Sequence, residues 1–118
     1  MNIKLIDAVV EQIGDRDSLA DAARAGADAG FCGFTYYSDT VDFYDRNKAL
    51  ILDLVIDQAD QFGLSRVEFL KGFNCIDGDL MENEIGEIVY GDGDSTTVKN
   101  ALAWFALEEV ARHENPNV

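Results

Sequence analysis

Residues 38–63 read SDTVDFYDRNKALILDLVIDQADQFG and carry the longest unbroken helical pattern in the chain. At 100° per residue, their apolar side chains gather on one side of a helix. The opposite side is acidic over an arc of about 120°, and at ~1.5 Å per residue this acidic row extends over roughly 30 Å. Its members are Asp39, Asp42, Asp45, Asp53, Asp57 and Asp60. We therefore expect a long helix that packs through one face and presents carboxylates on the other. A break at Arg46 and Asn47, where asparagine favours a turn, would divide the row in two.

Capping residues indicate further helices on both sides of this segment. Polar N-caps, helix-ending glycines and apolar residues at helical spacing bound each of them, and Ser65 with Glu68 has the spacing of a capping box. These signals predict three helices in the first half of the chain: over residues 3–13 between Asn2 and Gly14, from Asp15 or Asp17 to Gly26, and from Ser38 or Thr40 to Gly63. They predict three more in the second half: from Ser65 to Phe73, within 77–90 after a turn at 77–79, and over 96–113 before Pro116.

The block GADAGFCGFTYYSDT, residues 26–40, is rich in glycine and aromatic residues. Closely spaced glycines argue against a regular helix, and the aromatic residues favour an extended backbone, so we expect an aromatic loop with a short extended piece at 34–37. Such a loop either fills the core or forms a ligand pocket. The spacing of Gly30 and Gly33 does not match a nucleotide-binding loop, because neither GxGxxG nor GK[ST] occurs.

The predicted fold class is all-α, a single compact bundle of about six helices with the aromatic, glycine-rich loop across it. A chain of 118 residues, 47% of them hydrophobic, can bury a core as one domain over residues 1–118 without disulfides or metal. Cys32 and Cys75 stand in apolar surroundings, which is typical of buried thiols in a reducing compartment. The first residues lack the pattern of a signal peptide, and no apolar run is long enough for a membrane span, so we expect a cytoplasmic protein.

The charge of the chain restricts its partners. Nine Lys and Arg residues stand against 23 Asp and Glu residues, a net charge of −14. Nucleic acid and anionic membranes are polyanions, so both are disfavoured as direct partners, whereas basic proteins and basic ribonucleoprotein complexes are favoured.

No catalytic or metal-binding pattern stands out. His113 is the single histidine, and its distance in sequence from the two cysteines gives neither zinc-ligand spacing nor a Cys-His pair. The acidic segment from Asp77 fails as a calcium loop, because its sixth position is Glu82 and its twelfth is Ile88. We expect neither an enzyme nor a cofactor-binding or metal-binding protein.

Two blocks carry a resemblance, GADAGFCGFTYYSDTVDFYDRNK at residues 26–48 and NALAWFALEEVAR at 100–112. They resemble a family of small acidic proteins of bacteriophages and prophages. The resemblance implies an accessory protein that acts in the cytoplasm of the bacterial host. By analogy with other small acidic phage proteins, it implies an inhibitor of host defence of the anti-CRISPR or antirestriction class.

Three hypotheses follow. The first is a non-enzymatic inhibitor whose acidic helix face occupies the basic nucleic-acid groove of a defence complex. The second is a helical interaction or assembly module, with a homodimer as one form, and the third is an enzyme or ligand binder with a pocket at residues 31–37. The candidate partner-binding residues are the six aspartates of the acidic row, further acids at Glu82, Glu84 and Glu87, and the aromatic residues Tyr37 and Trp104.

Overall fold

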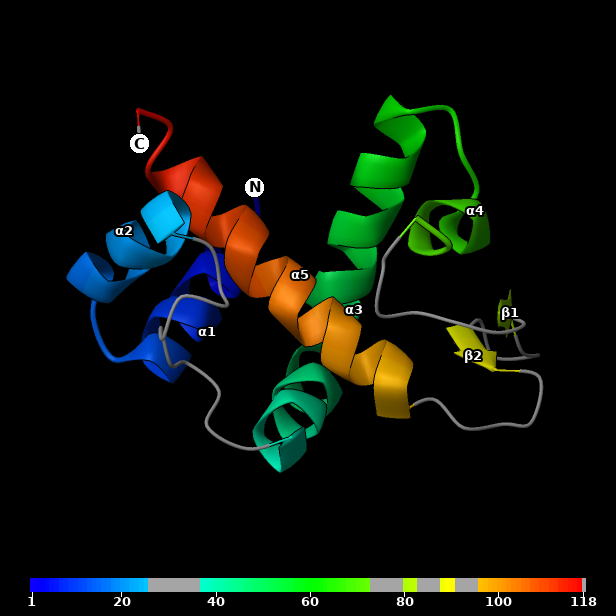
Figure 1. Cartoon of the computed structure of the whole chain (residues 1–118), viewed down its shortest axis with the longest axis horizontal. Helices are drawn as coiled ribbons and strands as arrows, with labels where there is room; N and C mark the ends of the chain where they lie inside the picture. The colour runs from blue at the N-terminus through cyan, green and yellow to red at the C-terminus, as the bar shows by residue number, and fades with distance from the viewer. Residues whose placement is uncertain (26–36, 73–79, 83–87, 91–95, 118) are drawn as a thin grey trace.

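Helix α5 (Thr96–Glu114) crosses the middle of the fold, and three other helices pack against it (Figure 1). The computed structural model describes residues 1–25, 37–72, 80–82, 88–90 and 96–117. Within these ranges the remaining elements are, in chain order, α1 (Ile3–Ile13), α2 (Arg16–Ala25), α3 (Tyr37–Gln61), α4 (Arg66–Leu70), β1 (Leu80–Glu82) and β2 (Ile88–Tyr90).

The core is built around α5. Its buried residues cover most of its circumference, as expected of a helix enclosed by neighbours on several sides. Small side chains let the neighbouring helices approach closely, and α3 makes the most extensive contact, followed by α2. The buried residues of α5 are Val98, Ala101, Leu102, Ala103, Ala106, Leu107, Val110 and Ala111. The radius of gyration of 13.8 Å is close to the ~13.5 Å of a compact chain of this length.

Local signals at the first two helices are confirmed. The Oδ1 of Asn2 accepts a hydrogen bond from the backbone N–H of Lys4 at 2.8 Å, and Gly14 ends α1 with a φ of 105°. Asp15 then caps α2, since its Oδ1 accepts from the N–H of Ser18 at 2.7 Å. These contacts satisfy backbone groups that a helix end leaves unpaired.

The turn between α3 and α4 is also the predicted one. Gly63 has a φ of 67°, and the N–H of Leu64 donates to the carbonyl of Ala59 at 2.9 Å, which together form a Schellman C-cap. Directly after it, Ser65 and Glu68 form the expected capping box at the start of α4, with both hydrogen bonds at 3.2 Å. Both sides of this turn are therefore fixed by backbone hydrogen bonds.

Helix α3 is broken at Asn47, where φ is −121° and ψ is 20°. The side-chain Nδ2 of Asn47 donates to the carbonyl oxygen of Phe43 at 3.0 Å. A side chain that competes for a helix carbonyl in this way is a known cause of a helix break. Figure 1 shows the two halves of α3 running in different directions. The acidic row is therefore divided, with three aspartates on each half, and is not one continuous ridge.

The helical class is confirmed, with three corrections. The described residues contain five helices, where about six were expected. The helix expected over 77–90 is wrong in its described parts, because β1 and β2 are extended and pair antiparallel, with Met81 opposite Val89. The β-favouring residues of β2 and pairing between strands outweigh an apolar spacing that also fits a helix.

The third correction concerns the start of the long helix. It begins at Tyr37, so neither Ser38 nor Thr40 is its N-cap, and residue 37 is not extended. Thr40 is buried instead, and its hydroxyl donates to the Oδ1 of Asn100 on α5 at 2.7 Å. The aromatic loop, Cys32 and Cys75 lie outside the described residues.

Candidate functional site

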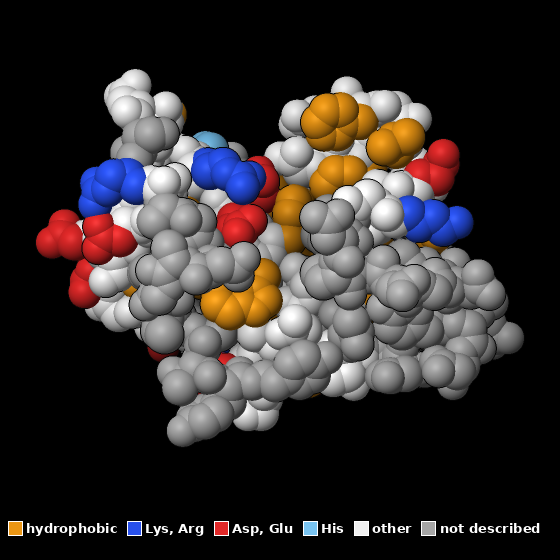
Figure 2. All heavy atoms as spheres, in the orientation of Figure 1, with side chains coloured by type: hydrophobic (Ala, Val, Ile, Leu, Met, Phe, Trp, Pro, Cys, Tyr) orange, Lys and Arg blue, Asp and Glu red, His pale blue; other side chains and the backbone are white. Residues whose placement is uncertain are grey.

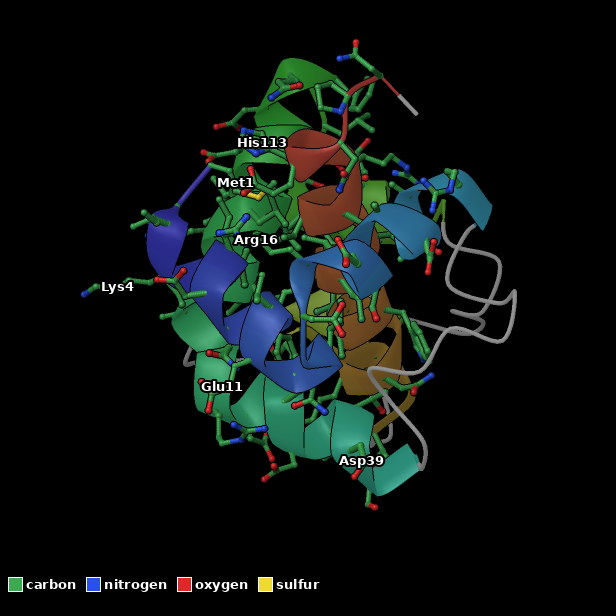
Figure 3. The ribbon with its side chains drawn as sticks, turned by 90° about the vertical axis from the view of Figure 1, so that its left-hand side faces the viewer. Met1, Lys4, Glu11, Arg16, Asp39 and His113 are labelled. Atoms are coloured by element: carbon green, nitrogen blue, oxygen red, sulfur yellow. The ribbon has the colours of Figure 1, made fainter. Side chains whose placement is uncertain are left out.

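The two halves of the acidic row differ in how their charges are compensated. On the first half, Asp42 accepts a hydrogen bond from the Nε of Arg46 at 3.0 Å, one helical turn away. Asp45 accepts from the Nζ of Lys99 on α5 at 2.8 Å. Asp39, labelled in Figure 3, is half-buried and also has an interaction partner. The charges of this half are therefore largely compensated, by a pair within α3 at Asp42 and by a pair that joins α3 to α5 at Asp45.

The second half presents its charges to solvent. Asp53, Asp57 and Asp60 are exposed, and within the described ranges none of them forms an ion pair. Their helix packs through the opposite side, where Ile51 and Val55 are buried. We call Asp53, Asp57 and Asp60 the acidic face.

Helix geometry places the acidic face in a narrow row. At 100° per residue the three aspartates fall within an arc of about 60°, and at ~1.5 Å per residue they extend over roughly 10 Å. Ile56, 37% exposed, stands on the same side, three residues after Asp53 and four before Asp60. The surface thus combines one apolar side chain with three carboxylates that have no ion-pair partner in the described part of the chain.

The position of the acidic face is electrostatically unfavourable for the helix itself. Asp60 lies in the last turn of α3, which carries no basic residue to balance the negative end of the helix dipole. Asp57 stands four residues after Asp53 and three before Asp60, at spacings where like charges repel. The helix therefore holds these charges at a local cost in stability.

The remaining predicted partner-binding residues do not join the acidic face in the described structure. Glu82 belongs to β1, which packs beside α4. Tyr37 is the first residue of α3 and its side chain is not described, while Glu84 and Glu87 lie outside the described residues. Trp104 is half-buried on α5 against the core. The helical spacing of residues 96–113 predicts a core position for Phe105 and a partly exposed one for Trp104, and the structure shows both half-buried.

An apolar surface at the turn between α3 and α4 was missed by the sequence pattern. The helical period of residues 38–63 predicts Phe62 on the packing face of the long helix, but the side chain is 67% exposed, and Leu64 beside it is exposed too. The ring of Phe62 stacks on that of Phe69, with centroids 6.5 Å apart, and Phe69 meets Phe105 of α5 edge-on at 5.7 Å. We call Phe62, Leu64 and Phe69 the α3–α4 corner. The available signal was the place of Phe62 directly before the helix-ending Gly63, where the helical period no longer applies.

The single histidine belongs to a surface network at the far end of α5. The Nδ1 of His113 lies 3.1 Å from the Oε2 of Glu114, and the Oε1 of Glu114 accepts from Arg16 of α2 at 2.9 Å. The hydrogen bond from Arg16, followed by that from His113, lowers the pKa of the Glu114 carboxyl. Figure 3 shows His113 far from Asp39 at the start of α3. This network fastens α2 to α5 and is separate from the acidic face.

Two further findings concern metal binding and membrane crossing. Among the residues that the structure describes, no three His, Cys, Asp or Glu side chains gather closely enough to hold a metal ion. In the same residues, no helix combines the length and the apolar character that crossing a membrane requires.

Comparison with known proteins gives one match. A family model described as Domain of unknown function (DUF7222) matches residues 4–114. Neither the curated proteins nor the solved structures that were compared gave a significant match.

Proposed function

The chain belongs to the DUF7222 family, and we propose that it is a non-enzymatic binding protein that inhibits a bacterial nucleic-acid-binding defence complex. In this proposal the acidic face of α3 enters a basic groove of that complex and takes the place of phosphates. The observation that carries the proposal is the set of three exposed aspartates without ion-pair partners among the described residues, opposite the packed side of their helix. The resemblance to small acidic phage proteins supports the anti-CRISPR or antirestriction class and a site of action in the host cytoplasm.

The charge spacing favours a groove that holds a single strand. Three carboxylates over roughly 10 Å give one charge per ~5 Å, compared with ~3.4 Å for one nucleic-acid strand and ~1.7 Å for a duplex. The acidic face thus approaches the density of one strand and falls well short of that of a duplex. A short basic groove suits this surface better than a long duplex channel.

The rest of the chain contributes to the attraction of a basic partner at longer range. A net charge of −14 produces a negative potential that speeds encounter with a basic surface and repels nucleic acid. The acidic face then supplies short-range contacts, and Ile56 adds an apolar contact beside them. We expect the charges of the first half of α3 to contribute less, because Asp42 and Asp45 are already paired.

Capture from a nuclease-treated bacterial lysate tests the proposal. At about 50 mM NaCl the immobilised protein should retain a basic nucleic-acid-binding protein that added single-stranded nucleic acid or about 500 mM NaCl releases. The triple variant Asp53→Asn, Asp57→Asn, Asp60→Asn should lose this protein.

A matched control keeps the charge change but moves it to another element. The variant Asp7→Asn, Glu11→Gln, Asp17→Asn removes the same number of charges from α1 and α2, and it should retain capture. Equal capture by wild type and by the triple variant of the acidic face would refute the proposal.

A further inference from the structure

The α3–α4 corner exposes neighbouring apolar side chains to solvent. Single exposed hydrophobic residues are ordinary on protein surfaces. Here, however, Phe62 at 67% exposure stands beside the exposed Leu64 and stacks on Phe69. Figure 2 shows hydrophobic side chains gathered over the end of α3 and over α4, with acidic and basic side chains beside them. A contiguous patch of this kind marks an interaction surface.

The corner is also rigid. The Schellman cap at Gly63 fixes the chain before Leu64, and the capping box of Ser65 and Glu68 fixes it directly afterwards. These hydrogen bonds hold the backbone that carries Phe62 and Leu64 in one conformation, with both side chains exposed. An aromatic side chain that is held outward in advance loses little conformational freedom on binding.

The charges around the corner indicate which kind of partner binds it. Asp57 and Asp60 stand before it on α3, Arg66 stands on α4, and Lys71 follows the last residue of α4. Residues 57–72 contain two basic residues and three acidic residues, a net charge of −1, in a chain whose total is −14. A second copy of this chain is repelled by most of the surface, but at this segment the charges of the two signs nearly balance.

The corner is complementary to itself. In a two-fold contact, if residue i of one copy meets residue j of the other, then j also meets i. The corner carries charges of both signs, so a two-fold contact centred on Phe62 and Leu64 allows the cations of each copy to face the acids of the other. The apolar side chains meet in the centre, and the attractive charges form the rim, which is the usual anatomy of an interface.

We propose that two copies of this chain associate through the α3–α4 corner, with Phe62 and Leu64 in the centre and Lys71 of each copy facing Asp60 of the other. This inference goes beyond the proposed function, because it needs no basic partner. Asp60 is shared by both surfaces, whereas Phe62 belongs only to the corner and Asp53 only to the acidic face.

Sedimentation equilibrium over a concentration series tests the association. Wild type should form a dimer, and Phe62→Glu should raise its dissociation constant at least about tenfold, because each substitution acts twice in a two-fold contact. Ile3→Glu is the matched control, since Ile3 on α1 is 70% exposed and should leave the constant unchanged. A wild-type monomer at all concentrations, or a dimer indifferent to Phe62→Glu, would overturn the inference.

A mixing experiment tests the charge pairing with exposed positions only. Lys71→Glu and Asp60→Lys should each weaken the homodimer, because each places like charges opposite one another. An equimolar mixture of the two variants should form the mixed dimer, because the reversed charges at positions 60 and 71 then attract each other across the interface. Circular dichroism of each variant confirms that it is folded. A mixture that associates no better than its components would contradict the pairing. Loss of lysate capture in Asp53→Asn with an unchanged dimer would separate the two proposals.

Discussion

Replacing Asp60 by asparagine should make the protein more stable. This is unusual for a substitution on a folded protein, where most changes destabilise. Asp60 lies in the last turn of α3, near the negative end of the helix dipole, and it stands three residues after Asp57. Asparagine has nearly the same size and helix propensity as aspartate, so the change removes the charge and little else.

The expected gain in the free energy of unfolding has two electrostatic contributions. Removing an acid from the C-terminal turn relieves ~0.3–1 kcal/mol of unfavourable dipole interaction. Removing one like-charge neighbour relieves a further ~0.2–0.5 kcal/mol. The free energy of unfolding should therefore rise by about 1 kcal/mol, which raises Tm by roughly 3–5 °C in a chain of this size.

Thermal unfolding followed by circular dichroism measures the effect, at a protein concentration low enough to keep the chain monomeric, so that the proposed contact of Asp60 with Lys71 of a second copy does not contribute. At about 20 mM salt the variant should melt above wild type, and at about 1 M NaCl, where charge interactions are screened, the difference should largely vanish. Asp42→Asn is the contrasting control: Asp42 is paired with Arg46, so its loss should lower Tm slightly. Asp7→Asn controls for net charge, because its helical neighbours Lys4 and Glu11 act on it with opposite signs.

The reasoning would be refuted by a Tm of Asp60→Asn at or below that of wild type at low salt. A gain that persists unchanged in about 1 M NaCl would refute it as well, because the source would then not be electrostatic.

Three further substitutions test the fold. Gly63→Ala should lower the free energy of unfolding by about 1–2 kcal/mol, as measured by urea denaturation, because a φ of 67° is strained for alanine while its Cβ meets no atom within 4 Å. Thr40→Val should cost about 1–2 kcal/mol in the same assay, since it removes the buried hydrogen bond to Asn100; an unchanged midpoint would show that this bond contributes nothing. Glu114→Gln should lower Tm at pH 7 but progressively less as the pH falls. The pKa of Glu114 is lowered in the folded state by its hydrogen bond from Arg16, so its stabilising contribution is present above the ordinary value of 4.5 and is lost as the pH falls through the folded value.

The sequence predicted best the helix ends that are set by hydrogen bonds between residues close together in the chain. Asn2, Gly14, Gly63 and the Ser65 capping box act on backbone groups only a few residues away, so their meaning does not depend on the rest of the fold. The break near Asn47 was anticipated for the same reason. Its consequence, the division of the acidic row, needed only the positions of the aspartates.

The parts that the sequence did not predict depend on contacts between distant residues. The pairing of β1 with β2 competes with an apolar spacing that fits a helix, and strands of three residues are too short to show alternation. The pairing of Asp45 with Lys99 joins two helices and has no counterpart in either one alone. The acidic row could thus be located from sequence, but the sequence did not show which of its charges are compensated by ion pairs.

The location of the acidic face distinguishes a binding role from a purely solubilising one. Solubility depends on net charge and is served by an acid anywhere on the surface. It does not require carboxylates at the C-terminal end of α3, where they oppose the dipole and repel one another. A binding surface does require them at one place, even at a cost in stability. Measuring Tm and lysate capture on the same Asp60→Asn variant therefore separates the two roles: a gain in Tm with weaker capture indicates binding, and a gain in Tm with unchanged capture indicates solubility alone.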